Sequence, residues 1–234
     1  MKLVLFDIDG TLLWTDGTGR KAVHEALIEI FGAAPPSGHE FDGKTDPQIV
    51  RELMQLAGVP NADVEARLPI AIARYVELLH GELAASSQHG NVYPGVPALL
   101  DALEQREDVL LGLLTGNVHE GADAKLGAVG IARDRFKVGA FGSDHAARPE
   151  LPAIARARAE ALLGHALEGS DVVVIGDTPA DMGCGRGIGA RAIGVATGRY
   201  SVDALRACNA AAVFADLSDT DAVLDAILGR GAHA

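Results

Sequence analysis

The chain is poor in cysteine and in positive charge, and both shortages exclude classes of protein. Its 234 residues include two cysteines, Cys184 and Cys208, which are too few for a disulfide framework or a cysteine metal site. Lysine and arginine together number 20 against 32 aspartates and glutamates, a formal net charge of −12. A chain this acidic, without a basic cluster, repels nucleic-acid backbones at long range, so we expect no nucleic-acid partner.

Long apolar runs are missing as well. No run of about 18 apolar residues could cross a bilayer, and Asp7 and Asp9 interrupt the first apolar stretch too early for a secretory signal peptide. With 48% hydrophobic residues, the composition is that of a globular protein. We therefore expect a soluble protein of a reducing, cytoplasmic compartment, monomeric or homodimeric, with no membrane partner.

Short apolar runs alternate with amphipathic stretches over most of the chain, and this alternation predicts the fold class. Strand-like runs occur at residues 2–6, 108–117, 171–177, 190–198 and 211–217. Helical periodicity occurs at residues 96–107, 151–167 and 219–231. Strands that alternate with helices imply right-handed crossovers. We predict an α/β protein with a Rossmann-like parallel sheet and helices on both of its faces.

Residues 15–90 interrupt this alternation. They contain helical stretches at residues 19–32, 46–59 and 64–83, with no strand-like run between them. A helical insertion directly after the first strand indicates a separate lobe, and the glycine- and proline-rich turn at 89–96 suits its return point. We therefore predict a core formed by residues 1–14 and 91–234 and an inserted α-helical cap formed by residues 15–90.

Polar side chains follow the predicted strands at their carboxyl ends. Asp7 and Asp9 leave the first strand on the same side, the next strand ends at Thr115, and a third ends at Asp177 with Asp181 shortly after. These ends meet at the edge where open parallel sheets bind ligands. Carboxylates crowded there in an acidic chain need a cation. Mg²⁺ suits them because it prefers oxygen ligands and keeps waters and phosphate oxygens in its shell.

Three motifs resemble those of a known family. The sequence reads DIDGT at 7–11, LLTGN at 113–117 and VVVIGDTPAD at 172–181. In this order, at strand ends and with a helical cap after the first motif, they resemble the haloacid dehalogenase superfamily of phosphotransferases. The resemblance covers essentially the whole chain. The cap loop FDGKTDPQI at 41–49 is similar to the specificity loop of phosphoglycolate phosphatase-like members.

The resemblance implies a role for each motif residue. Asp7 is expected to be the nucleophile that forms an aspartyl-phosphate. Asp9 is expected to protonate the leaving oxygen and then to activate water. Thr115 would donate a hydrogen bond to the phosphoryl group, and Gly116 and Asn117 would supply further donors. The Mg²⁺ ligands expected from the family are Asp7, the carbonyl of Asp9, Asp177 and Asp181.

The cation that the family places beside the nucleophile departs here from the common Lys-Pro pattern. Arg148 precedes Pro149, whereas Lys137 lies in a predicted strand at 134–141. We expect Arg148 to fill this position, because a guanidinium fork can serve a phosphate and a carboxylate together. For Asp181, the roles of metal ligand, orienting residue and helix cap all stay open.

Substrate choice is expected to depend on the cap. Lys44 and Thr45 of the specificity loop are candidates for substrate contact, and Arg20 is a candidate for binding an anionic tail of the substrate. A solvated loop lysine and a helix-surface arginine are the alternatives for Lys44 and Arg20. The glycine-rich stretch at 183–190 does not directly follow a strand, so we expect it to serve helix packing and not dinucleotide binding.

Together these features predict a Mg²⁺-dependent phosphatase that hydrolyses a small phosphorylated metabolite, phosphoglycolate or a similar phosphomonoester. Asp9 favours phosphate esters, since family members that cleave carbon–halogen bonds do not keep this acid and those that cleave phosphonates generally replace it. A phosphomutase of the β-phosphoglucomutase type would retain the same acids and stays open. A non-catalytic phosphate-binding regulator would need neither Asp9 nor a cap.

Overall fold

A parallel sheet is the central feature of the computed structural model, which describes residues 1–85 and 90–230. Within these residues, the main sheet has six parallel strands in the order β5–β4–β1–β6–β7–β8. Their bounds are β1 (Lys2–Phe6), β4 (Val109–Leu114), β5 (Val138–Ala140), β6 (Val172–Gly176), β7 (Arg191–Val195) and β8 (Ala212–Phe214). From β1 the chain builds the sheet first on one side and then on the other. Ligands bind at such a switch point in open α/β sheets.

Helices cover both faces of this sheet. They are α4 (Val96–Glu104), α5 (His119–Ala128), α6 (Leu151–Leu163), α7 (Pro179–Cys184), α8 (Val202–Arg206) and α9 (Thr220–Leu228). Successive side chains of β1 point to opposite faces. Val4 and Phe6 share a buried cluster with α4, α5 and α9, whereas Leu3 and Leu5 share one with α6. The prediction of a parallel α/β core with two covered faces is confirmed.

Three of the differences between the predicted and the observed elements involve the strand at 134–141, helix α5 and the return turn. The strand predicted at 134–141 is shorter in the structure, where it is β5, and Lys137 lies just before β5. Helix α5 was not predicted, because its sequence HEGADAKLGA has no regular apolar repeat. The return turn predicted at 89–96 contains a short strand, β3 (Asn91–Val92), while His89 lies outside the described residues.

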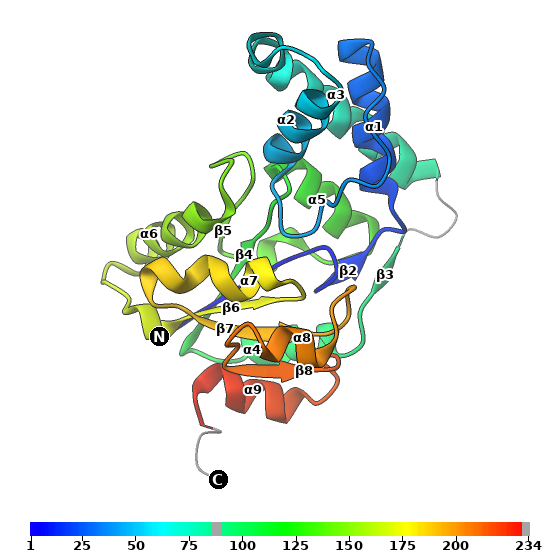
Figure 1. The fold of residues 1–234 in the computed structure, drawn as a ribbon. Coiled ribbons are helices and arrows are strands. Elements are labelled where there is room, and N and C mark those ends of the chain that lie inside the picture. Colours follow the sequence, from blue (N-terminus) through cyan, green and yellow to red (C-terminus); the bar gives the residue numbers. More distant parts are fainter. Residues whose placement is uncertain (86–89, 231–234) are drawn as a thin grey trace.

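Helices α1 (Thr18–Phe31), α2 (Asp46–Leu56) and α3 (Asn61–Ala85) lie between β2 (Leu13–Trp14) and β3. Figure 1 shows them gathered at the top of the view, apart from the sheet. We call them the helical segment. Their buried faces share a hydrophobic cluster of their own, to which the core contributes Val118. Strands β2 and β3 pair antiparallel. The chain therefore leaves the core and returns to it through one short two-stranded ribbon.

None of the helices in residues 1–85 and 90–230 combines the length with the apolar character that a membrane span requires.

The loop that precedes α2 docks directly onto the carboxyl edge of the sheet. The backbone N–H of Asp46 donates to the carbonyl of Gly116 at 2.8 Å, and the carboxylate of Asp46 accepts the N–H of Val118 at 2.8 Å. Gly116 has no space for a side chain, because a Cβ there would lie 1.9 Å from the carbonyl oxygen of Lys44. The absence of a side chain at Gly116 therefore allows the helical segment to close over the sheet edge.

Replacing Gly116 by alanine should push this loop away from the sheet edge. For Gly116→Ala we expect the amides of Asp46 and Val118 to exchange with deuterium at least about tenfold faster, because the docked loop opens more often. The matched control is Gly127→Ala on the exposed side of α5, where a Cβ meets nothing within 4 Å. This control should stabilise the protein by about 0.5–1 kcal/mol. Equal exchange rates in the two variants would contradict the prediction.

Candidate active site

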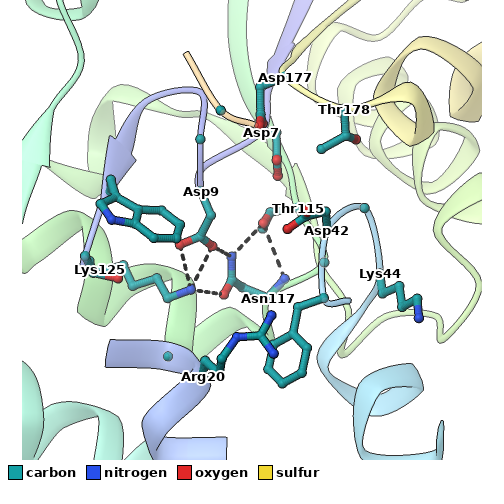
Figure 2. A pocket seen from close by; sticks show the side chains of 18 of the residues that line it. Asp7, Asp9, Arg20, Asp42, Lys44, Thr115, Asn117, Lys125, Asp177 and Thr178 are labelled. Carbon is teal, nitrogen blue, oxygen red and sulfur yellow. Dashed lines mark hydrogen bonds and ion pairs between the residues drawn. The ribbon is translucent and has the colours of Figure 1, made fainter. Parts of the chain in front are cut away.

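A cavity of about 430 Å³ lies between the carboxyl edge of the sheet and the helical segment. Its sheet side is formed by strand ends and its opposite wall by α1, α2, α3 and the loop before α2. Figure 2 shows side chains of some of the residues that line it. Residues predicted from distant parts of the sequence therefore meet in one place. Those that line the cavity are Asp7, Asp9, Arg20, Lys44, Thr115, Gly116, Asn117, Arg148 and Asp177.

Three buried carboxylates form a cluster, and two of them, Asp7 and Asp177, line this cavity. Asp7 follows β1, Asp177 follows β6, and Asp181 lies in the first turn of α7. One oxygen atom from each lies within 4.8 Å of the others. This spacing allows a single cation to contact all three, and carboxylate oxygens are ligands that Mg²⁺ prefers.

Glycines make room for the carboxylate of Asp177. A Cβ at Gly10 would lie 2.3 Å from Oδ2 of Asp177, and one at Gly198 would lie 1.8 Å from the same atom. Thr11 donates a hydrogen bond to the other oxygen at 3.1 Å. The DIDGT motif therefore supplies a nearby carboxylate and also the space and the hydroxyl that hold Asp177 in place.

Burial and mutual repulsion perturb this cluster strongly. Burial raises the pKa of Asp177 to about 9, and the charges of Asp181 and Asp7 add to the rise. Burial also raises the pKa of Asp7 to about 7, an effect that the Arg148 guanidinium opposes and that Asp181 and Asp9 reinforce. Carboxylates with raised pKa values resist losing their protons together. A divalent cation would relieve this repulsion.

Arg148 lies beside the cluster, as the Arg-Pro pattern predicts. Its Nη2 is 3.2 Å from Oδ1 of Asp7 and also donates to Asp181. Its Nε is buried and has no hydrogen-bond partner among the described residues. Lys137, the alternative, is directed elsewhere and donates to the carbonyl of Asp134 at 2.7 Å.

Asp181 caps α7 in addition to contacting Arg148. Its Oδ2 accepts the N–H of Thr178 at 3.0 Å and the hydroxyl of Thr178 at 2.6 Å, while its own N–H donates to that hydroxyl at 3.2 Å. This reciprocal arrangement is a capping box. The helix-cap alternative is therefore part of the role of Asp181, and direct metal ligation by this residue stays a prediction.

Thr115 is placed to donate a hydrogen bond into the cavity. Its Oγ1 accepts the backbone N–H of Asn117 at 3.3 Å and the side-chain amide of Asn117 at 2.8 Å. Because Oγ1 is the acceptor in both bonds, its hydrogen can be donated to a bound acceptor, and no described residue is recorded as accepting it. Asn117 was expected to serve the substrate, yet its side-chain amide hydrogens go to Thr115 and Asp9. The side chain of Asn117 therefore holds two site residues in place.

Lys125 is a site residue that the sequence did not reveal. It lies in α5, buried, and its Nζ contacts both carboxylate oxygens of Asp9 at 2.8 and 2.7 Å. The missed helix explains the missed residue, because a lysine in a stretch without apolar periodicity gives no sign of being buried. A weak signal was available: Lys125 is the only lysine between Lys44 and Lys137.

The predicted cap residues occupy different positions relative to the cavity. Arg20 lines it, stacks 3.9 Å above the ring of Phe41 and donates to the carbonyl of His39 at 2.7 Å. Lys44 also lines it, but its ammonium pairs with Glu52 at 2.6 Å and is directed away from Asp7 in Figure 2.

Thr45 holds the loop in place and does not line the cavity. The hydroxyl of Thr45 is buried and donates to the carbonyl of Ala146 at 2.6 Å, while it accepts the N–H of Gln48 at the start of α2. The prediction of direct substrate contact by Thr45 is therefore corrected, because its hydroxyl hydrogen is used to join the helical segment to the core.

Comparisons with known proteins give a family and a fold for this chain. A family model described as haloacid dehalogenase-like hydrolase matches residues 1–189. A search by sequence among curated proteins gave no match. Among solved structures, a hydrolase from Pseudomonas syringae superposes with a TM-score of 0.70 at 21% identity, covering 97% of this chain and 98% of that chain.

Two further solved structures are similar to this chain. A predicted phosphoglycolate phosphatase from Haemophilus somnus 129PT has a TM-score of 0.67 at 19% identity, covering 96% and 98% of the two chains. CbbY from Rhodobacter sphaeroides, solved in complex with phosphate, has a TM-score of 0.64 at 20% identity, covering 94% and 96%. At these identities the likeness shows a shared fold.

The raised pKa of Asp177 predicts how stability depends on pH when no metal is present. Between about pH 4 and about pH 9, the folded protein keeps a proton on Asp177 that the unfolded chain releases. The contribution of Asp177 to the free energy of unfolding therefore falls as the pH rises through this window. In urea titrations without metal, wild type should lose stability relative to Asp177→Asn between pH 5 and pH 8.

Millimolar Mg²⁺ should reverse this loss in wild type at pH 8 and have little effect on Asp177→Asn. The exposed Asp203→Asn variant is the matched control and should respond as wild type does. A stability difference that does not vary with pH, or an equal Mg²⁺ effect in both proteins, would show that Asp177 is not in the perturbed cluster described here.

Proposed function

The chain belongs to the haloacid dehalogenase-like hydrolases, and from its site we propose that it is a Mg²⁺-dependent phosphatase acting on a small phosphomonoester through an aspartyl-phosphate on Asp7. The observation that carries the proposal is the buried cluster of Asp7, Asp177 and Asp181 with Arg148 against it. Such a cluster combines a carboxylate nucleophile with groups that hold a cation and a phosphate.

The residues present fit Mg²⁺. With all three acids ionised, the buried carboxylates exceed the charge of the one guanidinium beside them, and the glycines around Asp177 leave space for its carboxylate. Asp7, Asp177 and the carbonyl of Asp9 would hold the ion, with Asp181 as a further ligand or as an orienting residue. When bound, Mg²⁺ would align the phosphoryl group and neutralise the charge on its oxygens.

The side chains divide the reaction between them. The carboxylate of Asp7 attacks phosphorus, and the bond to the leaving oxygen breaks as that oxygen takes a proton from Asp9. A water then attacks the aspartyl-phosphate, gives its proton to Asp9 and releases inorganic phosphate, which restores Asp7. Thr115 and Arg148 donate hydrogen bonds to the phosphoryl oxygens during both steps.

The helical segment supports the assignment of the substrate. In this proposal residues 15–90 act as a cap that excludes water from a cavity of about 430 Å³. Arg20 faces the cavity from the cap and suits a substrate with a second anionic group. Phosphoglycolate, a small phosphomonoester with a carboxylate, remains the leading candidate. It is supported by the likeness in fold to a predicted phosphoglycolate phosphatase.

Asp7→Asn should abolish turnover. With p-nitrophenyl phosphate and Mg²⁺ we expect a loss of about 10³-fold or more, because the amide is a far weaker nucleophile than the carboxylate. A chelator should remove wild-type activity to the same extent. The exposed Asp203→Asn variant should retain full activity. Undiminished, Mg²⁺-dependent turnover by Asp7→Asn would contradict the covalent scheme.

The reaction product distinguishes a phosphatase from the alternative, a phosphomutase. With β-glucose 1-phosphate as substrate, a phosphatase releases inorganic phosphate, whereas a mutase accumulates glucose 6-phosphate. A screen of phosphorylated small molecules by phosphate release would then rank phosphoglycolate against larger substrates.

Arg148→Ala should lower turnover strongly, whereas Lys137→Ala should not. Removing Arg148 takes a buried donor from the phosphoryl oxygens and a positive charge from Asp7, so kcat should fall by about 10²–10³-fold. The exposed Lys137 donates to the carbonyl of Asp134, and its loss should change kcat by less than about twofold. The reverse order of effects would assign the cation to Lys137.

A further inference from the structure

Lys125 is a buried cation that the roles proposed above do not use. Only 7% of its side chain is exposed, against 31% for its partner Asp9. Its Nζ lies 2.8 and 2.7 Å from the two oxygens of Asp9 and 2.7 Å from Oδ1 of Asn117. An ammonium group has three N–H donors, and these contacts account for all of them. Lys125 therefore has no donor left for a substrate phosphate.

The network continues from Lys125 to the phosphoryl side of the cavity. The side-chain nitrogen of Asn117 donates to Oδ2 of Asp9 at 2.7 Å and to Oγ1 of Thr115 at 2.8 Å. Dashed lines in Figure 2 trace this chain of contacts, and the carboxylate of Asp9 is directed toward Lys125 and away from Asp177. Both oxygens of Asp9 are therefore held by protein groups, and Lys125 is the group that holds both.

The helical segment encloses Lys125 from the other side. A Cβ at Gly19 of α1 would lie 3.3 Å from Nζ of Lys125 and 3.9 Å from the hydroxyl of Tyr75 of α3. The lysine is thus confined between the helical segment and Asp9. This confinement restricts the rotamers of Lys125, and through its contacts it restricts those of Asp9 as well.

A purely structural ion pair is the competing explanation. Taking a lysine out of water is costly, and replacing a buried ion pair by apolar residues is often neutral or stabilising. Stability alone therefore gives little reason for this lysine. The orientation of a carboxyl group that has to meet a leaving oxygen gives a better one, because proton transfer requires a defined approach within hydrogen-bond distance.

We propose that Lys125 is a positioning residue, which together with Asn117 fixes the carboxyl group of Asp9 for proton transfer to the leaving oxygen. The inference rests on the proposed function, in which the phosphorus–oxygen bond breaks, Asp7 takes the phosphoryl group and Asp9 gives its proton to the departing alkoxide. Without Lys125, the carboxyl group of Asp9 keeps, among the described residues, its hydrogen bond from Asn117 and can rotate about its side-chain torsions.

Two substrates that differ in their need for the acid test the proposal. Ethyl phosphate has a leaving group that must be protonated, whereas 2,4-dinitrophenyl phosphate releases a stable anion. For Lys125→Met, kcat/KM should fall by about 30-fold or more with ethyl phosphate and by less than about threefold with the aryl ester. The ratio of the two values does not depend on the folded fraction, so a merely structural role would leave it unchanged.

Further variants complete the experiment. Lys125→Arg should restore most of the ratio, because a guanidinium can donate two N–H groups to one carboxylate. The exposed Lys137→Met variant is the matched control and should keep the wild-type ratio. If Lys125→Met does not fold, Lys125→Gln supplies the same measurement. Equal effects on both substrates, or no recovery in Lys125→Arg, would overturn the proposal. Wild type that cleaves neither substrate would contradict the proposed function instead.

Discussion

Repulsion between buried carboxylates is the constraint on which this structure depends. Asp7 is far in the chain from Asp177 and Asp181, and the parallel sheet brings an oxygen of each within 4.8 Å of the others. Burial raises the pKa values of Asp7 and Asp177. The protein's own groups therefore do not fully balance the negative charge that these carboxylates carry when ionised. The buried guanidinium of Arg148 offsets part of this repulsion. The remainder is what makes the site suited to a divalent ion and a phosphate.

The residues around the carboxylate cluster leave space beside it and also cover the cavity. Glycines at positions 10 and 198 leave space around Asp177, and Gly116 lets the loop before α2 approach the strand ends. The contacts that close the cavity are mainly backbone hydrogen bonds and buried side chains such as Asp46. The exposed ion pairs of Arg199 with Glu40 and Asp42 also join the loop to the core, but pairs of this kind contribute little in water.

The two aspartates of the DIDGT motif have different environments. Asp7 is buried against Arg148 and the other acids, whereas Asp9 is partly exposed and is held by Lys125 and Asn117. Acids with separate partners can take separate parts in one reaction, the first as a nucleophile and the second in proton transfer. The α5 helix supplies the cation for Asp9, and the segment leading into α6 supplies the one for Asp7. Each aspartate therefore depends on a part of the chain far from the motif itself.

The sequence by itself determined the order of the elements and the acids at the strand ends. Buried strands such as LVLF require continuous apolar residues, and the motif spacings are local, so both can be read without coordinates. Arg148 was predictable from the resemblance to the family, since it precedes Pro149 where the family places its cation. Lys125, the loop-holding role of Thr45 and the internal hydrogen bonds of Asn117 were decided by the tertiary structure alone. Their partners lie about a hundred residues away in the chain, and α5 has no apolar periodicity to show which of its side chains is buried. Packing between α5, the helical segment and the sheet edge decides those contacts, because side chains distant in sequence become neighbours only when all three are assembled.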